Sequence, residues 1–211
     1  MKVIPILRLA FWLALISWVP SLYAGQANVP IQELKSGGYV ILVRHGTTPE
    51  SVLPREQRTG EPSPLDLARC ELQFNLTEQG RDEAHAIGVG VQRLGIPVGR
   101  VVSSPYCRTQ ETARLAFGRV DEISEALVRR SYVPIPGAPV PPRWQQRIEA
   151  LRRLLATAPV SGTNTVLVTH NDNIRDAVGF EITAAEPCGA IWFSMEAIFW
   201  YAPNEVRTGS V

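Results

Sequence analysis

YVILVRHG, residues 39–46, joins five apolar, largely β-branched residues to an arginine, a histidine and a glycine. An apolar run without polar alternation is typical of a strand that is buried on both faces of a sheet. Gly37 and Gly38 precede the run and favour a turn before it. Arg44 and His45 are therefore expected at the carboxyl end of a buried strand.

Helical patterns alternate with two further short apolar runs along the chain. The runs cover residues 101–103 and 165–169, and apolar residues at helical spacing cover residues 77–94, 108–117, 144–155 and 171–179. This alternation predicts an α/β fold, a three-layer sandwich with a mainly parallel sheet and helices on both faces. Residues 190–200 mix aromatic and β-branched types and are predicted to form an antiparallel edge strand.

Two long segments lack apolar periodicity. Residues 47–70 are rich in Pro, Gly, Arg and Glu and are predicted to form a surface loop over the site. Residues 118–143 are rich in proline and are predicted to form a cap or insertion.

Polar residues follow each of the three predicted strands. Arg44 and His45 follow the first strand, SSPYCR at residues 103–108 follows the second, and His170 follows the third. Ligands of open α/β sheets bind beyond the carboxyl ends of the strands. We therefore predict one site that contains Arg44, His45, Arg108 and His170.

These four side chains suit a phosphoryl group. The guanidinium groups of Arg44 and Arg108 can hold phosphate oxygens in pairs, whereas an ammonium group cannot. A neutral His45 can attack phosphorus, and a protonated His170 can stabilise the group in transfer. Either histidine alone would fit a structural role, but the pair at two strand ends favours a phosphohistidine intermediate on His45.

No metal ion and no cofactor are expected. The chain has no HxH, HExxH or CxxC pattern, and arginines at the predicted site repel cations. His85, the remaining histidine of the chain, falls inside a predicted helix and is expected on its surface.

The composition is that of an ordinary globular domain. The 211 residues suffice for one domain with a substantial core, and the net charge of +1 gives no sign of a nucleic-acid partner. Residues 1–24 are predicted to be a signal peptide, because Lys2 and Arg8 lead into a short apolar run that ends before Ala24. An uncleaved anchor helix is the alternative, although the run is shorter than a membrane span. Residues 25–211 then form the mature domain, which is periplasmic or extracellular without stable membrane insertion.

Three cysteines remain in that mature domain, Cys70, Cys107 and Cys188. An oxidising compartment permits one disulfide. Cys70 ends the loop that leaves the carboxyl edge of the first strand, and Cys107 lies at the carboxyl end of the second strand. We therefore predict a Cys70–Cys107 bridge and a free Cys188, with three unpaired thiols as the alternative.

Four ordered segments resemble the histidine phosphatase (phosphoglycerate mutase-like) superfamily. They are LVRHG at residues 42–46, LTEQGR at 76–81, SSPYCRTQETA at 103–113 and VTH at 168–170. The resemblance implies the α/β fold of that family and a phosphate pocket of Arg44, His45, Arg108 and His170. It also implies that His45 is phosphorylated in turnover.

Two departures from the family pattern concern the reaction. Residues 47–61 contain no asparagine, which argues against mutase activity, and Arg129 stands where many members carry a glutamate acid. The acid that protonates the leaving group must then lie elsewhere. The candidates are Glu125, ranked first, Glu122, and Asp172, a shifted analogue of the aspartate that follows the second histidine in one branch.

The sequence as a whole predicts a metal-independent phosphomonoester hydrolase for a small phosphorylated substrate. A protein phosphohistidine phosphatase and a catalytically weak phosphate-binding envelope protein are the alternatives. Four arginines in segments expected to border the pocket either favour an anionic substrate or are solvated surface charges: Arg55, Arg58, Arg129 and Arg130. The sequence predicts neither the physiological substrate nor the oligomeric state.

Overall fold

A computed structural model describes residues 31–50, 67–130, 137 and 139–178, and the backbones of three strands between residues 190 and 209. The predicted signal peptide, most of the predicted loop at residues 47–70, and Cys188 lie outside the described residues. No helix among the described residues is long and apolar enough to cross a membrane.

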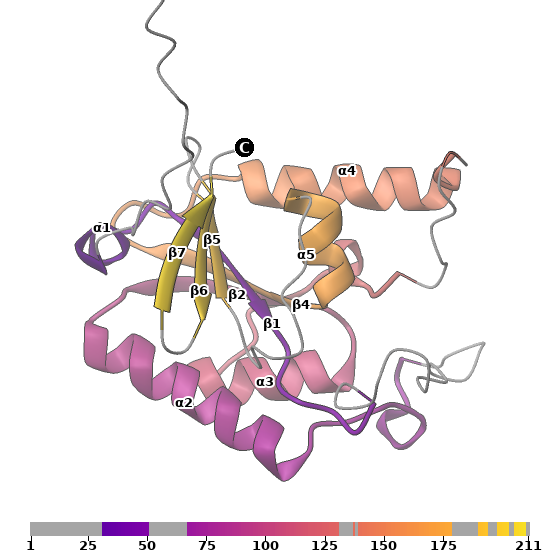
Figure 1. Ribbon diagram of the computed structural model, residues 1–211, viewed down its shortest axis with the longest axis horizontal. Helices are drawn as coiled ribbons and strands as arrows, with labels where there is room; N and C mark the ends of the chain where they lie inside the picture. Colours follow the sequence, from indigo (N-terminus) through magenta and orange to yellow (C-terminus); the bar gives the residue numbers. More distant parts are fainter. Residues whose placement is uncertain are drawn as a thin grey trace, which may run out of the picture.

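The centre of the fold is a seven-stranded sheet with the order β3-β2-β4-β1-β5-β6-β7 (Figure 1). The strands are β1 Val40–Arg44, β2 Val98–Ser103, β3 Glu122–Ile123, β4 Asn164–Thr169, β5 Ala190–Phe193, β6 Ile198–Ala202 and β7 Glu205–Gly209. The pairs among β3, β2, β4 and β1 are parallel, and β5, β6 and β7 add to β1 as an antiparallel extension.

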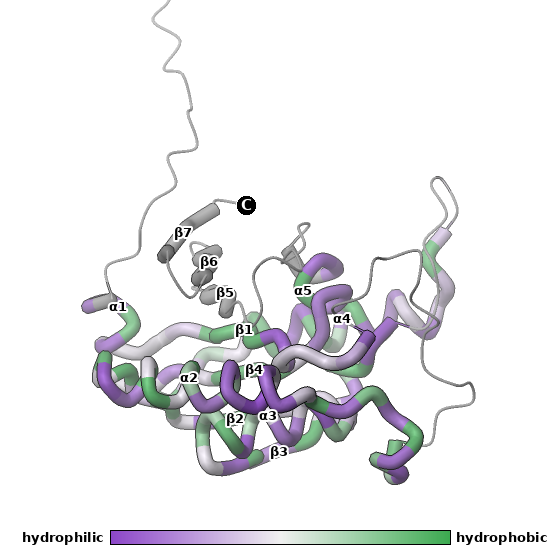
Figure 2. The backbone as a smooth tube through the Cα atoms, turned by 60° about the horizontal axis from the view of Figure 1, so that its bottom comes forward, coloured by the Kyte–Doolittle hydropathy of each residue, from purple (hydrophilic) through white to green (hydrophobic). Residues whose placement is uncertain are grey.

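Helices cover both faces of the sheet. They are α1 Ile31–Ser36, α2 Glu78–Leu94, α3 Cys107–Phe117, α4 Pro142–Ala156 and α5 Asn171–Val178, with 3₁₀ turns η2 Cys70–Leu72 and η3 Glu125–Leu127. Figure 1 shows α2 and α3 on one side of the sheet and α4 and α5 on the other. Hydrophobic and hydrophilic stretches alternate along α2, as expected of a helix with one face on a sheet (Figure 2).

The side chains of the central strands divide between two cores. Ile41 and Val43 belong to the core under α2 and α3, whereas Val40 and Leu42 belong to the core under α4 and α5. This division follows from the two-residue period of a strand. It also explains why residues 39–43 are uniformly apolar, since both faces of β1 are covered.

The predicted three-layer α/β architecture is confirmed, with two corrections. Residues 190–200 do not form one edge strand, because β5 pairs with β1 inside the sheet and the antiparallel edge is β7. The predicted cap at residues 118–143 contributes β3 and η3 to the fold. A two-residue strand is too short to show a period in the sequence, and β3 is held instead by its parallel partner β2.

Candidate active site

The parallel pairing of β1 with β4 brings the two strand-end histidines together. Arg44 is the register partner of Thr169, and the His45 N–H donates to the Thr169 carbonyl at 3.0 Å. The rings of His45 and His170 meet edge to face with centroids 5.2 Å apart. Both side chains are buried, so the pair is shielded from solvent at the carboxyl edge of the sheet.

The hydrogen bonds of His45 fix which ring nitrogen is free. Its Nδ1 lies 2.8 Å from the Gly46 carbonyl oxygen, which can only accept, so Nδ1 carries the proton. Nε2 of the neutral ring is then unprotonated. His45 therefore presents a nucleophilic nitrogen on the side of the ring away from its own backbone.

His170 is held from two sides. Ser104 Oγ lies 3.0 Å from its Nε2, and an Arg108 guanidinium nitrogen lies 3.5 Å from its Nδ1. Because a guanidinium only donates, Nδ1 is the acceptor and Nε2–H donates to Ser104. The edge of the Tyr106 ring also packs against His170, with centroids 4.6 Å apart.

Arg108 connects the pocket to the segment before α2. The side chain is 2% exposed, its guanidinium carbon lies 4.4 Å from the Tyr106 ring centroid, and one nitrogen donates to the Phe74 carbonyl at 3.4 Å. These contacts fix the planar group beside both histidines. A fixed guanidinium is preorganised to receive phosphoryl oxygens.

The electrostatics of the pocket keep both rings neutral. Burial lowers the pKa of His45 well below its usual 6.5, and the charges of Arg108 and Arg44 lower it further. Burial, followed by the charge of Arg108, lowers the pKa of His170 in the same direction. The predicted protonation of His170 therefore requires a bound anion, whose charge would raise this pKa.

Two glycines allow the loop after β1 to pass close to the start of α2. A Cβ on Gly46 would lie 2.3 Å from the Gly80 carbonyl oxygen, and a Cβ on Gly80 would lie 2.2 Å from the Thr47 carbonyl oxygen. Both distances are too short for a real side chain. The glycines of the RHG and LTEQGR segments thus permit a backbone contact that places His45.

Thr112 is a site residue that the sequence reasoning missed. Its hydroxyl accepts the Gly46 N–H at 3.1 Å and donates to the Arg108 carbonyl at 2.7 Å. This fully buried group joins the backbone next to His45 to the helix that carries Arg108. Its position four residues after Arg108 on a predicted helix was the available signal.

An outer charged cluster surrounds the pocket on the side of α4 and α5. Its members are Glu50, Arg129, Arg130, Arg147, Asp172 and Asp176. Arg129 lies 3.5 Å from the Glu50 carboxylate, and its charge lowers the pKa of both histidines. Arg147 stacks on the Trp144 ring at 3.7 Å, and burial lowers its pKa to about 10. Arg129, which stands where many members of the resembled family carry a glutamate acid, thus adds positive charge near the histidines.

The three predicted acids have different environments. Glu125 and Glu122 are exposed, and Glu122 pairs with Arg100. The Asp172 carboxylate accepts the Arg130 backbone N–H, and burial raises its pKa. Glu50, which the sequence reasoning missed, is a buried carboxylate five residues after His45. The ranking of Glu125 first has no support in this geometry, because its side chain faces solvent.

The predicted bridge between Cys70 and Cys107 is confirmed. The Cα atoms are 5.7 Å apart, and the bond joins η2 to the first residue of α3, directly before Arg108. Cys188 lies outside the described residues. The charge of Arg129 acts on both histidines, whereas Arg130 pairs with Asp176. Arg55 and Arg58 lie outside the described residues. His85 is exposed on α2, as predicted.

Comparison with known proteins agrees with this geometry. Residues 40–127, which include β1, His45 and Arg108, match the histidine phosphatase superfamily (branch 1). The similarity to this superfamily therefore covers the segment that carries His45 and Arg108. His170 lies beyond the matched range, but it completes the pocket by direct contact with Arg108 and His45.

Curated proteins that are similar to the chain are longer than it is. The mitochondrial serine/threonine-protein phosphatase Pgam5 of Drosophila willistoni is 29% identical over 182 residues, covering 77% of this chain and 54% of the relative. The same protein of Drosophila ananassae is 31% identical over 109 residues, covering 52% and 32%. The chain thus spans about half the length, or less, of these curated relatives.

Solved structures share the fold. An open reading frame product of Mycobacterium tuberculosis superposes with a TM-score of 0.51 at 21% identity, covering 82% of this chain and 96% of that one. A candidate α-ribazole-5′-P phosphatase of Escherichia coli gives 0.52 at 15% identity, covering 83% and 97%. These likenesses support the fold alone.

Proposed function

We propose that this chain is a metal-independent phosphomonoester hydrolase that works through a phosphohistidine intermediate on His45. The observation that carries the proposal is the buried pair of neutral histidines, 5.2 Å apart, with Arg44 and Arg108 beside them. The pocket offers one free imidazole nitrogen and two guanidinium groups. That set matches the needs of phosphoryl transfer, in which the protein supplies mainly position and charge.

The reaction proceeds in two displacements. His45 Nε2 attacks phosphorus, a P–N bond forms, and the P–O bond to the leaving group breaks. Water then attacks the phosphohistidine and gives a proton to the carboxylate that protonated the leaving group, the P–N bond breaks, and inorganic phosphate is released. Arg44 and Arg108 hold the phosphoryl oxygens in both steps, and His170, protonated once the incoming dianion has raised its pKa, donates a hydrogen bond to them.

Asp172 is the carboxyl group that we propose as the proton donor to the leaving group. Burial raises its pKa, so it keeps a proton to higher pH than an ordinary aspartate. It follows His170 by two residues at the start of α5, and Arg129 acts on both Asp172 and the histidines. Asp172→Asn should therefore slow an alkyl phosphate, which has a poor leaving group, far more than an aryl phosphate. Equal slowing of the two substrates would exclude this role. Glu50→Gln, which changes the other buried carboxylate described above, is measured for comparison.

Turnover of a chromogenic aryl phosphate in excess chelator tests the hydrolase proposal. No group of three or more His, Cys, Asp or Glu within the described part of the chain is arranged to hold a metal, so activity should persist. Vanadate should inhibit, since it mimics the five-coordinate phosphoryl group. His45→Ala should lower kcat/KM by several orders of magnitude, while His85→Ala, which removes an exposed histidine of α2, should leave it unchanged. A strict need for added divalent metal, or an active His45→Ala variant, would refute the proposal.

We also propose that the enzyme works in an oxidising, exported compartment after loss of residues 1–24. The support is the apolar segment in that range and the disulfide beside the site. Mass analysis of the protein recovered from the exported fraction should give a chain that begins at Gly25 with the bridge intact. A chain that keeps residues 1–24 would contradict the cleavage.

A further inference from the structure

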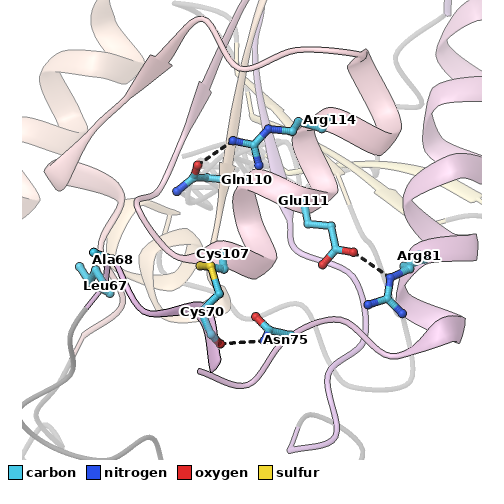
Figure 3. Close-up of a pocket in the computed structure, with 9 residues that line it drawn as sticks. All are labelled: Leu67, Ala68, Cys70, Asn75, Arg81, Cys107, Gln110, Glu111 and Arg114. Atoms are coloured by element: carbon cyan, nitrogen blue, oxygen red, sulfur yellow. Dashed lines mark hydrogen bonds and ion pairs between the residues drawn. A yellow bond between two sulfur atoms is a disulfide. The ribbon is translucent and has the colours of Figure 1, made fainter. Parts of the chain in front are cut away.

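A cavity of about 560 Å³ opens beside the disulfide, and neither histidine of the phosphate pocket lines it. Figure 3 shows the sulfur–sulfur bond between Cys70 and Cys107 in its wall, with Arg81 and Arg114 on the helices around it. A volume of this size suits a small molecule. The bridge is therefore within reach of a small thiol.

The two sulfurs of the bridge differ in their surroundings. Cys70 is an exposed residue on η2, whereas Cys107 is half-buried as the first residue of α3. The first turn of α3 has no acidic residue, so the helix N-terminus favours a thiolate at Cys107. An incoming thiolate thus meets the sulfur of Cys70 first, and Cys107 is the better leaving group.

The charged groups that line the cavity are Arg81, Arg114 and Glu111. Arg81 pairs with Glu111 at 2.7 Å and with Glu78 at 3.4 Å. The Arg114 guanidinium donates to the neutral Gln110 amide at 3.0 Å, and no carboxylate among the described residues pairs with it. Glu111 and Glu78 offset the charge of Arg81, so the positive charge that can attract an anion into the cavity is that of Arg114.

We propose that this cavity is a thiol–disulfide exchange site for a small anionic thiol, with glutathione as the probe. A glutathione thiolate attacks Cys70 Sγ, the bridge breaks, and Cys107 leaves as a thiolate, giving a mixed disulfide on Cys70. A second glutathione thiolate attacks the glutathione sulfur of that mixed disulfide, oxidised glutathione departs, and Cys70 is freed. The two glutathione molecules supply the two electrons and two protons that the cysteines gain.

Exchange at this site reaches the phosphate pocket through residues 70–76. The Gln73 amide oxygen accepts the Cys107 N–H at 3.0 Å, and the Phe74 carbonyl accepts from Arg108. Opening the bridge removes the covalent hold on this segment and loosens Arg108. This consequence rests on the proposed hydrolase function, whereas the exchange itself does not.

The exchange is tested on the full oxidised protein by acid quenching and peptide mapping after exposure to glutathione. The adduct is expected on Cys70. Arg114→Gln should slow adduct formation about two- to fivefold, the size expected for one nearby charge in a solvated cavity. Arg152→Gln, which removes an exposed arginine of α4, should have no effect. With the cationic thiol cysteamine, Arg114→Gln should not slow the reaction. A bridge that resists glutathione in the folded protein, an adduct on Cys107, or equal effects of the two arginine variants would overturn the proposal.

Activity gives the second readout. Opening the bridge should lower kcat/KM for an aryl phosphate about tenfold, and reoxidation should restore it. Oxidised enzyme without any turnover would refute the hydrolase function, while peptide mapping would still decide the exchange site. Exchange on Cys70 with unchanged kcat/KM would refute the link to Arg108.

Discussion

Replacement of Thr112 by valine tests the connection between the nucleophile and α3. Valine matches the shape of threonine but removes the hydroxyl that accepts the Gly46 N–H and donates to the Arg108 carbonyl. The Gly46 N–H is buried and would lose its partner, at a cost of about 2 kcal/mol in the free energy of unfolding. For a domain of this size that corresponds to a fall in Tm of roughly 4–8 °C.

Thr112→Val should also lower kcat/KM, and this kinetic loss is more informative than the loss of stability. A displacement of a reacting group by about 1 Å costs on the order of 100-fold, so we expect kcat/KM to fall about 10- to 100-fold. Thr112→Ser keeps the hydroxyl and loses one buried methyl group, which costs about 1 kcal/mol in stability. It should retain kcat/KM to within about threefold, a range well inside the loss expected for valine.

The assay pairs urea unfolding with steady-state kinetics on an aryl phosphate, for wild type and both variants. A folded Thr112→Val variant with wild-type kcat/KM would show that this hydrogen bond does not position His45. A Thr112→Ser variant with the same kinetic loss as valine would show that packing, and not the hydrogen bond, matters at this position.

Three further predictions follow from the site. Arg108→Lys keeps the charge but loses the planar fork, so kcat/KM should fall on the order of 100-fold or more, and equal activity would place Arg108 outside the reacting group's reach. Joint replacement of Cys70 and Cys107 by serine removes a cross-link across 37 residues and should lower the free energy of unfolding by about 3–4 kcal/mol, which urea titration against oxidised wild type will check. The pKa values of His45 and His170 are lowered in the folded protein, so the unfolded chain binds more protons below pH 6.5 and stability should fall as the pH drops from that value. Replacing His170 with glutamine should reduce this acid dependence, and an unchanged pH slope would contradict it.

The parts of the fold that local pattern determines could be predicted from the sequence. The uniformly apolar residues 39–43 predict a strand buried on both faces, and the parallel topology brings its end beside His170. Cys70 and Cys107 could be paired because each follows a strand that ends at the same edge of the sheet. These features could be predicted because each depends on a single helix or strand and on the elements next to it in the chain order.

The remaining features depend on contacts between residues distant in sequence. Thr112 and Gly46 are 66 residues apart in the sequence. The ion pair of Glu50 with Arg129 joins a segment that precedes α2 in the chain to one that follows α3. A contact between residues so far apart leaves no periodic pattern in the sequence. Glu125 ranked first among the acids because of its sequence position, but whether a carboxyl group is buried depends on the packing of η3 and α5 around it.

Detection of the phosphoenzyme decides whether His45 accepts the phosphoryl group. Wild-type protein is mixed with labelled aryl phosphate, quenched in alkali after a few milliseconds and mapped by mass spectrometry. We expect an acid-labile, alkali-stable phosphate on His45, formed at least as fast as turnover and absent from His45→Ala. Phosphate on His170, or steady turnover without any phosphorylated histidine, would contradict it.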